Sequence, residues 1–170
     1  MDKLTEAELN ALHEALEDEY QSWSIYDQVI QDFGEVRPFI NIRDAEARHI
    51  EALTRLFVRY GVPQPENTWP GKVERYSSVQ AACEASAAAE IANGDLYERL
   101  FKTELRPDIL TVLTNLQEAS LERHLPAFQR CAEGGAGQGG GQGNGRGAAG
   151  GRGAGGGQGR GRGQGGRGQQ

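Results

Sequence analysis

The chain has 170 residues and its composition changes abruptly after Glu133. Residues 134–170 hold 21 of the 25 glycines and five arginines but no acidic and no large apolar side chain, so they have nothing to offset the entropy of ordering. Residues 1–133 carry 24 acidic against 13 basic side chains, a net charge of −11, which argues against nucleic-acid binding by this part. No apolar run approaches a membrane-spanning helix. We predict one folded domain over residues 1–133 and a disordered Gly/Arg-rich tail over 134–170, with no membrane partner.

Two helices are predicted in the first 60 residues. A capping box at Thr5 and Glu8 opens the first, and apolar residues then recur every three or four positions until Gly34 ends the pattern. Pro38, in a first-turn position, restarts the chain, and the same alternation continues to Gly61. A short turn therefore joins two antiparallel helices.

Two more helices are predicted after a long connection. Residues 61–77 contain three prolines and Gly71, too many breakers for a helix. Ser77-Ser78-Val79-Gln80 offers a capping box for the third helix, Pro107 opens the fourth, and Pro126 should kink its last turns. A short, a long and a short connection match the ferritin-like arrangement, in which the long link makes helices two and three parallel. The predicted fold class is all-α, a ferritin-like four-helix bundle with one long crossover.

Glutamate or histidine interrupts the apolar inner stripe of every predicted helix. Residue counting from one end of the bundle places these side chains within about 9 Å of one level. Carboxylates and imidazoles offered from four facing helices form the ligand set that binds two iron or manganese ions, and the i,i+3 spacing of Glu46 and His49 aims both inward. The predicted metal ligands are Glu19, Glu46, His49, Glu90 and His124. The alternative is a buried network of salt-bridged Glu and His.

Several segments of the chain carry a family resemblance. They are Glu17-Asp18-Glu19-Tyr20, Tyr26, Phe33-Gly34, Asn41-Ile42, Ala45-Glu46-Ala47-Arg48-His49, Tyr60-Gly61, Glu90, Asp95-Leu96 and Glu122-Arg123-His124-Leu125. Over roughly residues 9–133 the sequence resembles the ferritin-like family called domain of unknown function 2202. The resemblance implies the bundle fold and kinship with rubrerythrins and other di-iron carboxylate proteins. By position, the five predicted ligands match the ligand pattern of that superfamily.

The fourth helix departs from the pattern. A second Glu-x-x-His motif would need Glu at position 121, where this chain has Leu121. Glu122 lies about 200° around the helix from His124, so it joins the site only if a kink at Pro126 rotates that turn. A one-metal or asymmetric two-metal site therefore fits the sequence as well as a full dinuclear centre. Tyr97 and Trp23, on inner stripes, are interpreted as core packing.

Two functions from different classes fit these residues. One is a redox metalloprotein of oxidase or peroxidase type, in which iron or manganese held by Glu and His reacts with oxygen, peroxide or Fe(II). The other is a non-enzymatic bundle that acts as a scaffold or stores or senses metal, with a flexible tail that weakly binds polyanions. A homodimer is compatible with either function.

The tail, the start of the chain and the cysteines complete the expectations. No aromatic side chain is interleaved among the tail arginines to stack on bases, so a flexible solubilising tail is favoured over nucleic-acid contact. The first residues lack a secretory signal, which favours a cytoplasmic location.

Cys83 and Cys131 each lie seven residues from a predicted ligand, so their Cα atoms should be within about 7 Å. In a reducing cytoplasm we expect free, buried thiols, with a disulfide only after oxidation. The tail arginines are Arg146, Arg152, Arg160, Arg162 and Arg167.

Overall fold

The computed structural model describes residues 3–135, and this part of the chain is helical without any strand. The prediction of an all-helical body is confirmed. The tail predicted for 134–170 lies almost wholly outside the described residues. No helix in the described part is long and apolar enough to cross a membrane. The elements are α1 (Glu6–Phe33), α2 (Phe39–Tyr60), α3 (Val79–Leu100), α4 (Pro107–Ala119), η1 (Ser120–His124), α5 (Leu125–Arg130) and η2 (Cys131–Gly135).

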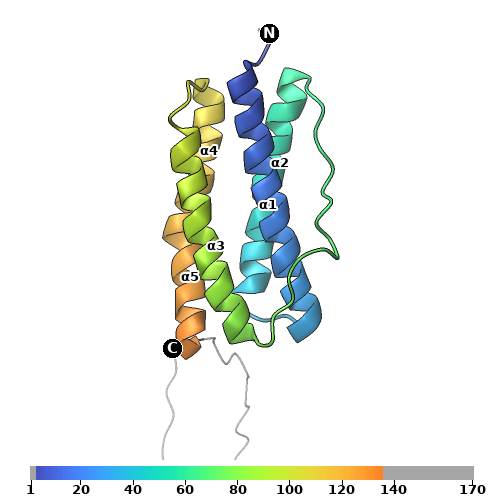
Figure 1. Cartoon of the computed structure of the whole chain (residues 1–170), viewed down its shortest axis with the longest axis vertical. Coiled ribbons are helices and arrows are strands. Elements are labelled where there is room, and N and C mark those ends of the chain that lie inside the picture. The colour runs from blue at the N-terminus through green and yellow to red at the C-terminus, as the bar shows by residue number, and fades with distance from the viewer. Residues whose placement is uncertain (1–2, 136–170) are drawn as a thin grey trace, which may run out of the picture. The chain divides into compact units, whose positions relative to one another are not determined.

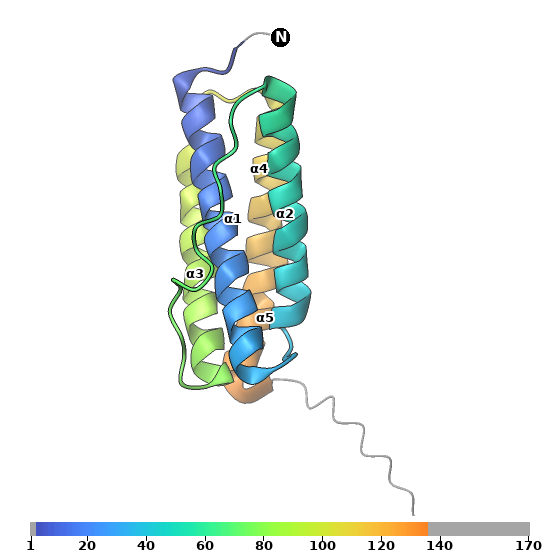
Figure 2. The ribbon, with the colours of Figure 1, turned by 90° about the vertical axis from the view of Figure 1, so that its right-hand side faces the viewer.

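The long helices lie side by side, and α4, η1 and α5 follow one another along a single rod (Figures 1 and 2). In Figure 1, α1 descends from the N-terminus, α2 returns upward, and the connection over residues 61–78 runs back down the outside. Helix α3 then rises and the α4–α5 rod descends. Helices α2 and α3 therefore run in the same direction, opposite to α1 and the α4–α5 rod.

Side-chain hydrogen bonds fasten the long connection to α1. The indole Nε1 of Trp69 donates to Oε1 of Glu17 at 2.9 Å. Nearer the start of the connection, Nε2 of Gln64 donates to the Tyr20 hydroxyl at 2.6 Å, and that hydroxyl donates to the Pro65 carbonyl at 3.2 Å. The connection is thus held along the helix that it passes.

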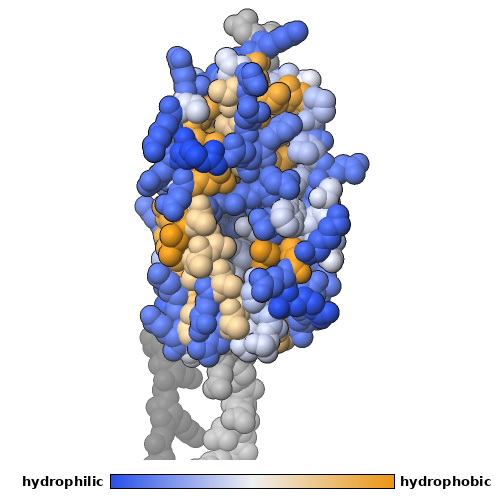
Figure 3. Space-filling view, in the orientation of Figure 1, coloured by the Kyte–Doolittle hydropathy of each residue, from blue (hydrophilic) through white to orange (hydrophobic). Residues whose placement is uncertain are grey.

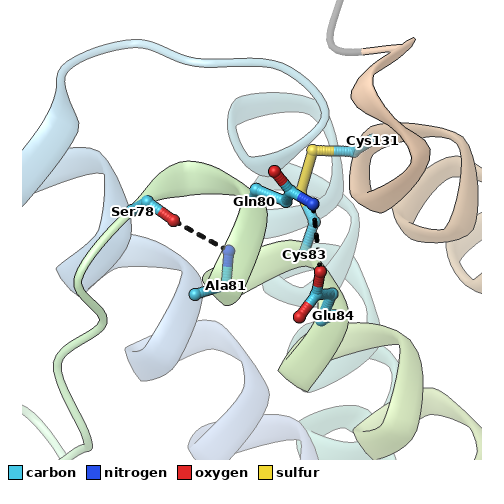
Figure 4. Close-up of a disulfide and its surroundings, with 6 residues drawn as sticks. All are labelled: Ser78, Gln80, Ala81, Cys83, Glu84 and Cys131. Atoms are coloured by element: carbon cyan, nitrogen blue, oxygen red, sulfur yellow. Dashed lines mark hydrogen bonds between the residues drawn. A yellow bond between two sulfur atoms is a disulfide. The ribbon is translucent and has the colours of Figure 1, made fainter.

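The helix ends follow local chemistry, with one correction. The capping box of Thr5 and Glu8 is present, and Gly61 ends α2 in the left-handed conformation at φ +63°. The capping box predicted at Ser77 is wrong. Ser78 is the N-cap of α3, and its Oγ accepts a hydrogen bond from the Ala81 N–H at 3.1 Å (Figure 4). Because Ala81 stands at the third position of this helix, no side chain there can return the bond.

Two apolar clusters fill the bundle, one on each side of a polar layer. The first gathers mainly Leu side chains near the start of α1 and the end of α2, among them Leu12, Leu16, Leu53, Phe57 and Leu113. The second is aromatic and gathers near the start of α2 and α3, with the rings of Tyr26, Phe39 and Phe128 at centroid distances between 5.1 and 5.8 Å. On each helix a Glu or His stands between residues of the two clusters.

The rod from α4 to α5 passes through a π turn at Ser120–His124. The kink predicted at Pro126 stays a prediction; the turn ends at His124, two residues before the proline. Proline lacks the N–H that would continue the α-helical ladder, and a wider turn lets the chain continue without that bond. At the same level α3 comes close, because a Cβ built on Gly94 would lie 2.7 Å from Cδ2 of Leu121. This close approach accounts for a glycine inside α3.

Cys83 of α3 and Cys131 at the end of α5 form a disulfide (Figure 4). Their Cα atoms are 5.8 Å apart, which confirms the predicted proximity, whereas the expectation of free thiols is wrong. Both side chains are buried in the aromatic cluster, and antiparallel packing brings them to one level within bonding range. The cytoplasmic location stays a prediction, which a disulfide does not favour.

The outer face of α3 is apolar but built from small side chains. Figure 3 shows it as a light-orange band between hydrophilic side chains. Ala88, Ala89, Ile91 and Ala92 are exposed along it. The predicted homodimer stays a prediction.

Candidate metal centre

The structure brings all five predicted side chains into one layer. Glu19 comes from α1, Glu46 and His49 from α2, Glu90 from α3 and His124 from the π turn η1. The three glutamates and His124 are buried, with at most 5% of each residue exposed, and His49 is half-buried. Burying carboxylates is costly unless partners satisfy them, so the contacts within the layer decide what it can do.

Glu46 stands at the centre of the layer and uses both of its oxygens. Its Oε2 lies 2.7 Å from Nδ1 of His49, and its Oε1 lies 3.1 Å from Nδ1 of His124. His49 Nδ1 is also 3.1 Å from Oε2 of Glu19, and His124 Nδ1 is 3.5 Å from Oε1 of Glu90. The two imidazole rings stack at a centroid distance of 5.5 Å. One carboxylate therefore links two histidines, each of which has a second carboxylate of its own.

These contacts define two overlapping ligand groups. Glu19, Glu46 and His49 form one group, and Glu46, Glu90 and His124 form the other. Within each group the candidate ligand atoms lie within 4.8 Å of one another. Each group offers two carboxylates and one imidazole, a donor set that suits divalent iron, manganese or zinc.

Two buried tyrosines hold the outer carboxylates in a reciprocal pattern. The Tyr97 hydroxyl on α3 donates to Oε1 of Glu19 on α1 at 2.7 Å. The Tyr26 hydroxyl on α1 donates to Oε1 of Glu90 on α3, also at 2.7 Å. In both helices the tyrosine follows its glutamate by seven residues, so the two side chains share a face. The prediction of Tyr97 as core is confirmed by its complete burial, but its hydrogen bond was not foreseen, although the repeated spacing was a usable signal.

Other polar side chains at this level also escaped the sequence reasoning. The Ser120 hydroxyl of η1 donates to Oε2 of Glu90. Asp18, beside Glu19, accepts a hydrogen bond from the Asn93 amide, and burial together with the nearby charge of Glu90 outweighs that bond and raises the pKa of Asp18 to about 6. Trp23, interpreted as core, is half-buried and belongs to neither apolar cluster. Of these side chains, Ser120 contacts a predicted ligand directly, through its hydrogen bond to Glu90.

The carboxylates of the layer raise the pKa of both histidines. Burial lowers the pKa of His49, but the carboxylates of Glu19 and Glu46 outweigh it and raise the pKa to about 10. For His124 burial acts in the same way, and Glu46 and Glu90 raise its pKa to about 9. Burial raises the pKa of Glu46, yet the two neighbouring histidines hold it well below its usual value. Burial and the charge of Glu46 raise the pKa of Glu19 well above its usual value. A cation entering the layer must therefore displace protons.

One buried nitrogen is left incompletely satisfied. Nδ1 of His124 lies within ion-pair distance of Glu46 and Glu90, but within residues 3–135 it makes no hydrogen bond of acceptable geometry. The distance alone would suggest a hydrogen bond, and the orientation decides against it because hydrogen bonds weaken steeply with angle. A buried ring nitrogen beside two carboxylates, without a hydrogen bond of good geometry to either, fits a cation that takes the place of its proton. The residues present therefore fit a metal ion.

The fourth carboxylate is absent from η1. Glu122 is exposed, so the π turn does not rotate it into the layer. Leu121 occupies the position that the ligand pattern reserves for glutamate, and it packs against Gly94 of α3. The layer accordingly holds three glutamates and two histidines in the described part of the chain.

No family model matches the sequence, and no curated protein matches it. Among solved structures, the fold is similar to that of a hypothetical protein from Methanococcus jannaschii DSM 2661, with a TM-score of 0.70. The two share 22% sequence identity over 79% of this chain and 84% of the other. At this identity the likeness concerns the fold alone.

Proposed function

We propose that the chain is a ferritin-like metalloprotein that binds two iron or manganese ions in the polar layer and acts as an oxidase or peroxidase on oxygen, peroxide or Fe(II). The observation that carries the proposal is the pair of ligand groups that share Glu46. A structural salt-bridge network would need only one partner for each charge. Two groups of matching chemistry, side by side and joined by one carboxylate, correspond to a dinuclear carboxylate site.

In this proposal some residues would be metal ligands, and others hydrogen-bond to those ligands and orient them. Glu19 and His49 would hold one ion, Glu90 and His124 the other, and Glu46 would hold both. Bound iron or manganese would supply one-electron chemistry with oxygen or peroxide. The hydroxyls of Tyr97, Tyr26 and Ser120 orient the two outer carboxylates. Such hydrogen bonds keep ligands in position and tune their basicity.

The helix arrangement supports the ferritin-like part of the proposal. The ligands come from facing helices at one level, and the long connection lies between two helices that run in the same direction. In ferritin-like proteins one long crossover produces that order. The resemblance to the family called domain of unknown function 2202 belongs to this proposal as well.

A non-enzymatic role is the second candidate, and the metal-free charge balance favours it. Two protonated histidines face the carboxylates of Glu19, Glu46 and Glu90, so the layer balances much of its own charge. A bundle of this kind would store or sense metal, or serve as a scaffold, without turning over oxygen.

The test begins with metal-free protein titrated with Fe(II) and with Mn(II) under nitrogen, followed by metal analysis after dialysis. We expect two ions per chain and a rise in melting temperature, because a ligand bound only by the folded state stabilises it. Admission of air to the Fe(II) form should then produce rapid oxidation with a new near-ultraviolet absorption. The matched control is Glu122→Gln, which removes an exposed carboxylate near His124 and should change neither result.

The alternatives separate cleanly in this experiment. Stoichiometric binding without oxidation in air would favour storage or sensing. Absence of binding, with metal-independent destabilisation on removal of Glu46 or His49, would leave a structural network and contradict the proposal.

A further inference from the structure

A cavity leads from the surface to the two histidines. It lies between α2 and the rod from α4 to α5, has a volume of about 340 Å³, and is lined by both His49 and His124. Three of its other lining residues are alanines, which leave the space open. Arg48 and Arg123 also line it, one from α2 and one from η1. A larger hollow of about 440 Å³ along α1 touches none of the five candidate ligands.

The two arginines carry positive charge that is not held in an ion pair. Neither forms an ion pair with any residue in the described stretch of the chain, and both are exposed. Other arginines in the same bundle are paired, such as Arg43 with Asp27 and Asp44. In a domain of net charge −11, two unpaired arginines at one opening create a local positive field.

The histidines contribute hydrogen-bond donors to the same space. Their Nδ1 atoms face the carboxylates, and neither Nε2 has a hydrogen-bond partner among residues 3–135. Metal-bound histidines usually donate the other ring N–H to an acceptor. Both imidazole rings line the cavity, so an anion held there would be the acceptor for these donors.

The net charge of the polar layer with two metal ions bound also favours an anion in this cavity. Ferritin-like dinuclear sites use four carboxylates, whereas this layer has three because Leu121 stands in the fourth position. Within the two ligand groups, three carboxylates leave two divalent cations with one uncompensated positive charge, and Asp18, the other acid at this level, belongs to neither group. An external anion in the cavity would supply the missing negative charge.

We propose that this cavity binds a small inorganic anion, held at its mouth by Arg48 and Arg123 and at its floor by the two histidines. The inference rests on the proposed dinuclear site. The anion compensates the positive charge that a fourth carboxylate would have balanced, and it enters from solution on this side of the bundle. Positive charge at a cleft raises the local concentration of such ions.

The experiment uses the full chain loaded with Co(II), whose visible spectrum reports changes at the metal, and azide as the anionic probe. Azide titrations would be compared for the parent, Arg48→Gln, Arg123→Gln and the double variant. We expect each single variant to raise the azide Kd about threefold and the double variant about tenfold, as befits partly solvated charges. The charge-keeping double variant, Arg48→Lys with Arg123→Lys, should restore most of the affinity. Arg130→Gln, an exposed arginine of α5 outside the cavity lining, is the matched control and should stay within twofold of the parent.

The outcomes distinguish the inference from the function on which it rests. If Co(II) binds at two per chain but the double variant binds azide as the parent does, the anion site is wrong and the metal site stands. If azide leaves the spectrum of the loaded parent unchanged, the anion site is equally wrong. If Co(II) does not bind at all, the proposed function fails and the inference fails with it.

Discussion

The two halves of the polar layer use the same chemistry on different backbones. In one half, His49 sits three residues from Glu46 on a regular helix and lies 2.7 Å from its carboxylate. In the other half, His124 sits on a π turn whose one glutamate, Glu122, is exposed, and it reaches across to the same Glu46 at 3.1 Å. The second half thus depends on a carboxylate that belongs to the first. A π turn in a helix is often found at functional sites, and here it presents His124.

The largest expected effect comes from the shared carboxylate. Glu46→Gln keeps the shape of the side chain but removes the charge that both ligand groups use. We expect metal analysis after dialysis to find no tightly bound ion, whereas Glu19→Gln and Glu90→Gln should each retain one. If Glu46→Gln kept a full ion in either half, that half would not depend on Glu46, and the shared role of this carboxylate would be contradicted.

The second effect is the pH dependence, and it should differ between the halves. The folded-state pKa values of His49 and His124 are raised from 6.5 to about 10 and about 9. Their contribution to the stability of metal-free protein is therefore fully present below about pH 6.5 and is lost as pH rises through 9 and then 10. Metal affinity should rise over the same interval by about tenfold per pH unit for each proton displaced.

Urea unfolding of chelator-treated protein between pH 6 and pH 10.5 would check the stability, and a pH indicator in weak buffer would count released protons. His13→Gln serves as control, because His13 is exposed and far along α1 from the layer. Unfolding curves that stay constant from neutral to alkaline pH would contradict the charge pairing.

A smaller effect is expected from the tyrosines. Tyr97→Phe and Tyr26→Phe each remove one hydroxyl that supports an outer carboxylate. Each should weaken metal binding about tenfold or more in its own half and cost about 1 kcal/mol of metal-free stability. Tyr76→Phe is the matched control, a half-buried tyrosine of the long connection. Unequal losses from the two layer variants, measured by competition with a chelator, would show which half binds more tightly.

The smallest effect on metal binding should follow loss of the disulfide. Cys83 and Cys131 join α3 to the end of α5 across 48 residues of sequence, on the side of the bundle that carries His124. Cys83→Ser with Cys131→Ser should lower the free energy of unfolding by about 2–4 kcal/mol. Metal affinity should fall only a few-fold and only in the His124 half, which paired titrations of oxidised and variant protein would measure. A larger loss in the His49 half would show that the halves are coupled through the core.

Much of this molecule could be predicted because helix formation leaves local signals. Thr5, Gly34 and Gly61 mark helix ends by capping chemistry, and the inward spacing of Glu46 and His49 follows from helical periodicity. The π turn could not be predicted in this way. A proline shows that one backbone hydrogen bond of the helix is missing, but not which backbone conformation accommodates the loss. The short distance between the two cysteines was predicted from their spacing. The disulfide itself is seen only in the assembled bundle.

The kinds of side chain in the layer, and their level along each helix, were already set by residue spacing. Which carboxylate meets which imidazole was decided by packing. Glu46 contacts both histidines because the rotation and axial position of α2 against η1 bring its second oxygen toward His124. Such contacts join residues far apart in sequence and depend on shifts of an ångström, for which periodicity holds no information. The cavity beside Arg48 and Arg123 exists for the same reason, because two helices that share no local sequence signal leave a space between them.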